Sequence, residues 1–144
     1  MSRRLAREMA LQILFQVDVN RDGTNIEEAL ACWSEEFSLP SANVPFARQI
    51  IMGALEHQKE IDQKIASLAD GWPLRRMPNV DRNLLRLATY EIYYCADIPG
   101  PVTLNEAIEL AKRFGGEESA KFVNGLLDKL AEGAGKREDS NCTI

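Results

Sequence analysis

The chain has 144 residues, of which 45% are hydrophobic and 27% are charged, so it is long enough to bury one hydrophobic core without disulfides or metals. No apolar run approaches the roughly 18 residues of a membrane span, and no apolar segment follows the N-terminus as in a secretory signal, so we expect a cytoplasmic protein. The net charge of −5 argues against nucleic-acid binding by the whole surface, although Arg3, Arg4 and Arg7 precede the first acid, Glu8, and could form a local basic patch.

The pattern of hydrophobic residues predicts helices in the first half of the chain, and no stretch alternates long enough to be a strand. We expect a first helix that begins after Ser2 as N-cap and ends near Asn20, where the sequence Asn-Arg-Asp-Gly is typical of a turn. A second helix is expected over residues 26–37, before Pro40. The third and fourth should span residues 44–68, with a break near His57. The fold class predicted is therefore all-α.

A fifth helix, expected over residues 80–95, has apolar residues on almost every side, which is typical of a central, buried helix. Glu91 falls within its apolar arc, so the carboxylate must find hydrogen-bond partners or a cation inside the protein. A structural role for this buried carboxylate is favoured over a functional one, although buried acids also occur in functional sites.

Two more helices complete a compact bundle of about seven. After the stiff Pro99-Gly100-Pro101 connection, Thr103 and Glu106 have the spacing of a capping box, which predicts that the sixth helix begins there. It should end at Gly115-Gly116, where glycine permits a helix to stop. The seventh helix is expected over residues 117–131. The polar, glycine-containing tail at 133–144 is predicted to be disordered.

The seventh helix carries a surface suited to RNA. Helical spacing places Glu118, Lys121, Phe122 and Gly125 on one side, away from the apolar residues that form the core. An aromatic ring beside a lysine, with a glycine one turn later that allows close approach, is what stacking on an unpaired base requires. The alternative is that Phe122 packs at the edge of the core, as aromatic residues at helical spacing often do.

The first helix has a second such stripe, formed by Arg4, Arg7, Leu11 and Phe15. Cations next to an aromatic ring suit contacts with phosphate and base. The pattern is equally compatible with a second packing layer for Leu11 and Phe15, in which case the arginines are only solvated.

The residues of an enzyme or a metal site do not come together in the sequence. His57 is the one histidine, and Cys32, Cys95 and Cys142 lie far apart, without C-x-x-C spacing. Gly115-Gly116 lacks the following G-K-[ST] of a phosphate loop. We therefore expect no catalysis, no cofactor and no metal, with Cys32 and Cys95 as core residues.

Three stretches, at 3–12, 79–91 and 97–129, closely resemble the NusB family of bacterial transcription antitermination factors, and the likeness extends over residues 3–130. The resemblance implies binding of single-stranded boxA RNA through the arginine-rich N-terminal segment and the sixth and seventh helices. Carried onto this sequence, the RNA contacts are Arg3, Arg4, Arg7, Phe15, Lys112, Arg113, Glu118, Ser119, Lys121 and Phe122. Glu118 repels phosphate, so it would accept from a base amino group or restrain affinity in favour of the right RNA.

The resemblance also implies a protein partner, the small-subunit ribosomal protein NusE. The polar face of the fifth helix, with Asp81, Arg82 and Arg86, is the candidate contact. Residues 1–132 would then form one NusB-like RNA-binding domain that, with NusE and RNA polymerase, promotes antitermination in transcripts such as rRNA operons, with a homodimer as a possible free state. The alternative is a helical adaptor that binds proteins and does not contact RNA.

Overall fold

The computed structural model describes residues 2–20 and 23–135, and within them seven α-helices account for the regular structure together with two short 3-10 segments. The all-α fold class is confirmed. The helices are α1 (Ser2–Val19), α2 (Ile26–Phe37), α3 (Val44–Glu56), α4 (Gln58–Leu68), α5 (Asn79–Tyr94), α6 (Gly100–Phe114) and α7 (Glu117–Gly133). The 3-10 segments are Ser41–Asn43 and Leu74–Arg76. Most of the tail predicted at 133–144 lies outside the described residues.

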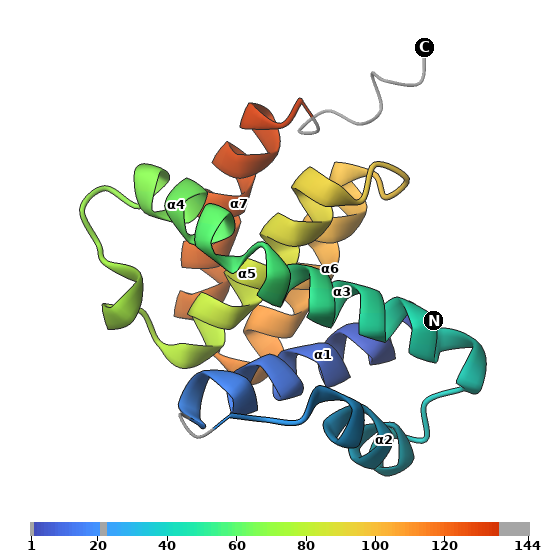
Figure 1. The fold of residues 1–144 in the computed structure, drawn as a ribbon. Helices are drawn as coiled ribbons and strands as arrows, with labels where there is room; N and C mark the ends of the chain where they lie inside the picture. Colours follow the sequence, from blue (N-terminus) through green and yellow to red (C-terminus); the bar gives the residue numbers. More distant parts are fainter. Residues whose placement is uncertain (1, 21–22, 136–144) are drawn as a thin grey trace.

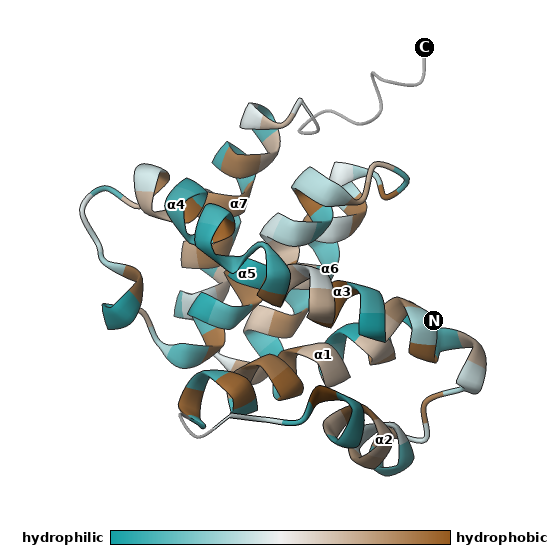
Figure 2. Cartoon of the chain, viewed as in Figure 1, coloured by the Kyte–Doolittle hydropathy of each residue, from teal (hydrophilic) through white to brown (hydrophobic). Residues whose placement is uncertain are grey.

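Helix α5 is the centre of the bundle, as predicted. It packs against α1, α3, α4, α6 and α7, and Figure 1 shows it surrounded by them, with α2 on the outer side of α1. Nearly every side chain from Asp81 to Ile92 is buried. In Figure 2, hydrophobic and hydrophilic segments alternate along the other helices, as expected for elements with one face toward α5.

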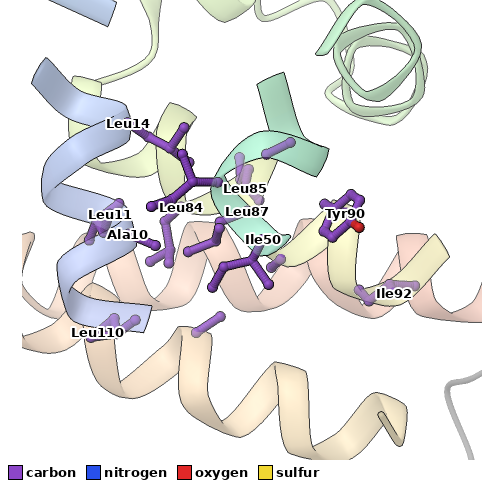
Figure 3. Close-up of a cluster of buried hydrophobic side chains, with 14 of the residues drawn as sticks. Ala10, Leu11, Leu14, Ile50, Leu84, Leu85, Leu87, Tyr90, Ile92 and Leu110 are labelled. Atoms are coloured by element: carbon purple, nitrogen blue, oxygen red, sulfur yellow. The ribbon is translucent and has the colours of Figure 1, made fainter. Parts of the chain in front are cut away.

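The core forms where side chains from α1, α3, α5 and α6 meet. Leu11 and Leu14 from α1, Ile50 from α3 and Leu110 from α6 converge on the leucines of α5 (Figure 3). Each of these side chains is almost fully removed from water, and burying one leucine or isoleucine contributes about 1.5–3 kcal/mol. Leu11 therefore belongs to a packing layer, which is the alternative for this residue that the sequence left open.

The start of α6 differs from the prediction. The helix begins at Gly100, with Pro101 in its first turn, and Thr103 does not cap it. Proline is favoured in a first helical turn because its φ is already helical and its missing N–H would be unpaired there. Thr103 thus lies inside the helix, where its hydroxyl donates to Oε1 of Glu91 at 3.0 Å. The expected break between α3 and α4 at His57 is confirmed.

The cysteine predictions are half right. Cys95 is buried, but Cys32 is exposed on α2, so its expected place in the core is wrong. The apolar face of α2 is formed instead by Ala29 and Leu30. Cys142 lies outside the described residues. Across residues 2–20 and 23–135, none of the helices is long and apolar enough to cross a membrane.

Candidate nucleic-acid interface

A groove crosses the surface where the turn after α4, the start of α5, the end of α6 and the start of α7 meet. Its volume is about 790 Å³, and its walls are Trp72, Pro78, Asn79, Val80, Asp81, Phe114, Gly115, Glu118, Ser119, Lys121 and Phe122. Four of these residues, Glu118, Ser119, Lys121 and Phe122, are RNA contacts predicted from the sequence. The structure therefore brings the α7 part of the predicted site together in one concave surface.

The groove continues to α1. A smaller hollow of about 180 Å³ is lined by Leu11, Gln12, Phe15, Val80 and Phe114. Because Val80 and Phe114 line both hollows, we treat them as one surface, the aromatic groove. Phe15 lies at the α1 end of this groove and is 39% exposed. The two rings predicted from the sequence, Phe15 on α1 and Phe122 on α7, therefore share one surface.

The floor of the aromatic groove is polar and rigid. The Ser119 hydroxyl donates to Oδ1 of Asp81 at 2.6 Å, and both side chains are buried. A Cβ at Gly115 would come within 2.3 Å of the Ser119 oxygen, so this position has no room for a side chain. Gly116, which precedes α7, has φ of 99°, a conformation that residues other than glycine rarely adopt. The Gly115-Gly116 pair thus lets α7 start close to the end of α6, and the Ser119–Asp81 hydrogen bond joins α7 to α5.

Phe122 has a dual environment. Its ring packs against the core on one side, and on the other its centroid lies 4.9 Å from that of Trp72, with the rings tilted by 51°. Phe122 is half-buried, so it packs at the core edge and also lines the groove. Sequence reasoning missed Trp72. The available signal was a large aromatic residue in a turn, between Gly71 and Pro73, because connecting segments carry a disproportionate share of binding residues.

Several charged residues at the end of α6 and the start of α7 are exposed. Lys121 and Glu118 lie on its wall, and Lys112 lies in the last turn of α6. Arg113 is also exposed, but its Nη1 donates to the buried Oε2 of Glu8 at 2.6 Å. That ion pair joins α6 to α1 beside the groove.

The N-terminal arginines lie at the other end of α1. Arg3 and Arg4 line a separate hollow of about 380 Å³, and Arg3 places its guanidinium carbon 4.2 Å from the centre of the Phe46 ring. Arg4 pairs with Glu106 through two hydrogen bonds of 2.8 Å. This pairing is the main cause that lowers the pKa of Glu106 and raises that of Arg4. Both arginines remain exposed, so phosphate could reach them.

Arg7 occupies a different place from the one predicted. Its side chain is 5% exposed, and its Nε and Nη2 donate to the two carboxylate oxygens of Glu91 at 2.7 and 2.8 Å. The expected exposed position for Arg7 is therefore wrong, because α1 turns this residue toward α5. The prediction for Glu91 is confirmed, since the buried carboxylate is held by a cation and by the Thr103 hydroxyl.

The exposed polar face expected on α5 is also wrong. Asp81 is 4% exposed and binds Ser119, and Arg86 is 9% exposed and binds Asp62 through two hydrogen bonds. Arg82 donates to Asp18 and to backbone carbonyls. These side chains mainly tie α5 to its neighbours, because a central helix is covered on almost every side.

One edge of this α5 network reaches the surface. Arg82 and Arg86 line a groove of about 600 Å³ together with Asp18, Val19 and the exposed Arg75. Burial raises the pKa of Asp18, but hydrogen bonds from Arg82 and Asn83 outweigh burial and hold the pKa below its ordinary value.

The described residues contain no group of three or more histidine, cysteine or acidic side chains able to hold a metal ion. A concave surface of aromatic rings with scattered cations, mounted on a rigid helical bundle, defines a binding protein.

Comparison with known proteins agrees with this class. The NusB family model matches residues 4–132. A transcription antitermination protein NusB of Desulfitobacterium hafniense is 52% identical over 139 residues, which cover 96% of this chain and 94% of the relative. The Bacillus subtilis protein of the same name is 50% identical over 132 residues, with 90% and 95% coverage.

Solved structures agree in fold. T. maritima NusB aligns with a TM-score of 0.86 and 41% identity, over 96% of each chain. A structure of the antitermination factors NusB and NusE in complex with double-stranded RNA aligns with a TM-score of 0.82 and 26% identity, over 92% of this chain and 97% of that one. The chain belongs to the NusB family of transcription antitermination proteins, which is a family of non-catalytic factors, so the expected absence of enzymatic activity follows from membership.

Proposed function

We propose that this chain binds boxA-type single-stranded RNA together with NusE and thereby promotes antitermination by RNA polymerase, as in rRNA operons. The observation that carries the proposal is the aromatic groove, which joins Phe15 on α1 to Lys121 and Phe122 on α7. Rings of this kind stack on unpaired bases, whereas the bases of a duplex are already stacked on each other. The related complex of NusB and NusE contains double-stranded RNA, so it supports NusE and RNA as partners, and the preference for a single strand rests on the rings of the groove.

Individual residues have different proposed roles. Phe15 and Phe122 would stack on bases, and Lys121 and Lys112 would neutralise phosphates. Ser119 would act through the floor that it forms with Asp81, because its hydroxyl is already donated. Glu118 is exposed on the wall and would accept from a base amino group.

The arginines would bind at a distance from the rings. Arg3 and Arg4 lie at the N-terminal end of α1, and Arg113 lies between them and the groove. RNA that contacts both would run along the side of α1 that faces α6. Phosphates would compete with Glu106 for Arg4 and with Glu8 for Arg113. Breaking these ion pairs would make the net free energy of RNA binding less favourable.

NusE would bind next to the groove that Arg82 and Arg86 line, with the exposed Val19 and Arg75 at its rim. In the complete assembly both proteins, the RNA and RNA polymerase would act together in the cytoplasm. The RNA-binding domain would comprise residues 1–132.

The decisive experiment is a titration of boxA RNA with this chain, with NusE and with both, at two salt concentrations. Tighter, salt-sensitive binding is expected from the pair, since each protein adds phosphate contacts to one surface. A scrambled RNA of equal length is the control. Equal affinity for the scrambled RNA, or no binding by the pair, would favour the protein adaptor, a reading that the internal pairing of Arg7 also favours.

Sedimentation of the free chain completes the test. A homodimer that dissociates when boxA RNA is added would mean that a second copy covers the aromatic groove. A monomer at all concentrations would leave the groove open to RNA.

A further inference from the structure

Trp72 is a large apolar side chain that the fold leaves in water. It is 44% exposed and lies in the turn between α4 and the 3-10 segment Leu74–Arg76. The backbone there is held in place, because the N–H of Trp72 donates to the carbonyl of Ala69 at 3.0 Å and Pro73 follows with fixed φ. The ring is thus presented from a rigid turn.

Phe122 supports the indole from one side. With centroids 4.9 Å apart and a tilt of 51°, the two rings meet in the tilted arrangement that aromatic pairs prefer. Phe122 in turn packs against the core. This contact restricts rotation of Trp72, whose side chain lines the aromatic groove.

The walls of the groove favour a particular occupant. Rings from Trp72, Phe122 and Phe114 provide flat apolar surface, Lys121 provides one positive charge, and the Asp81–Ser119 floor provides polar atoms. A planar group with polar edges that is attached to an anion satisfies all of these features, and a nucleotide is such a group.

We propose that Trp72 stacks on an unpaired base of the bound RNA and that Phe122 holds the indole in position for it. The RNA surface then extends beyond α1, α6 and α7 to the turn after α4. This inference rests on the proposed RNA-binding function and adds a stacking residue to it.

Fluorescence provides a direct test. The chain has two tryptophans, and the other, Trp33, lies on α2 with its indole donating to Gln16 at 3.1 Å. In a Trp33→Phe variant, emission comes from Trp72 alone, and titration with boxA-type single-stranded RNA is expected to quench it, because the base stacks on the indole. RNA binding with unchanged emission would overturn the proposal.

Affinity measurements with NusE present identify the occupant. Trp72→Phe should keep most of the affinity, whereas Trp72→Leu and Trp72→Ala should each lose roughly 5- to 150-fold, the range of one base–aromatic stack. The salt dependence should not change, because no phosphate contact is lost. Met52→Ala on α3 is the matched control, since Met52 is also 44% exposed but lies outside the aromatic groove; its affinity should stay the same.

The outcomes separate the two proposals. If the wild-type protein binds RNA and Trp72→Leu binds it with the same affinity, only the proposed role of Trp72 is overturned. Weaker binding of NusE by Trp72→Leu in the absence of RNA would mean that a protein side chain occupies the site, which also overturns it. No RNA binding by the wild-type pair would contradict the proposed function itself.

Discussion

Replacing Arg7 by alanine should destabilise the fold and leave the RNA surface intact. The substitution removes both hydrogen bonds from the guanidinium to Glu91, whose side chain is 1% exposed. Breaking a buried ion pair by removing one partner costs about 3–5 kcal/mol. At about 3–4 °C per kcal/mol for a chain of this length, the melting temperature should fall by about 10–20 °C.

Thermal unfolding followed by circular dichroism measures this loss, and RNA binding is measured well below the lowered melting temperature. The salt dependence of binding should remain that of the wild type, because the Arg7 guanidinium is buried and both of its hydrogen bonds go to Glu91. For stability alone, Arg4→Ala is the matched control on the same helix, since its exposed pair with Glu106 contributes at most about 1 kcal/mol. The double variant Arg7→Met, Glu91→Leu should recover most of the stability. An unchanged melting temperature in Arg7→Ala, together with a weaker salt dependence, would refute this reasoning.

Three further outcomes are expected. Gly125→Ala should stabilise the free protein by about 1 kcal/mol in denaturant unfolding, because a Cβ there meets no atom within 4 Å; a simultaneous loss of RNA affinity would mean that RNA approaches this backbone. Glu106→Gln should free Arg4 and strengthen RNA binding up to about fivefold in the same titrations, and weaker binding would contradict that competition. Because the pKa of Asp18 is lowered in the folded state, its contribution to stability is complete above its ordinary value of 3.8 and is lost as pH falls through the lower folded value; Asp18→Asn should therefore flatten the acid limb of stability against pH, and an unaltered acid limb would be evidence against the Arg82–Asp18 pair.

The helices could be predicted from the sequence because their signals are local. Glycine, proline and the spacing of apolar residues mark the ends of α2, α5 and α7 to within about two residues. The prediction for the start of α6 was wrong because two local signals competed there. Thr103 has the spacing of a cap, but Pro101 favours the first helical turn and the helix begins before it. Thr103 therefore lies inside the helix, where its hydroxyl donates to Glu91 on α5.

The exposure of charged side chains was harder to predict, since it depends on which helices meet. Arg4 and Arg7 lie on adjacent turns of one stripe of α1. Arg7 is nevertheless buried against α5, whereas Arg4 pairs with Glu106 on α6 and stays exposed. Asp81 and Ser119 are 38 residues apart and form one hydrogen bond. No periodicity within a single helix contains that information.

The aromatic groove depends on the same tertiary contacts as the fold, which limits how its residues can be tested. Asp81 and Ser119 form its floor and also join α5 to α7, and Phe122 lines its wall while packing on the core. Substitutions at these positions should change stability and RNA affinity together. Exposed side chains such as Lys121 and Trp72 contribute little to the core, so substitutions there should change RNA binding and leave stability nearly the same. At these positions binding can be measured separately from folding.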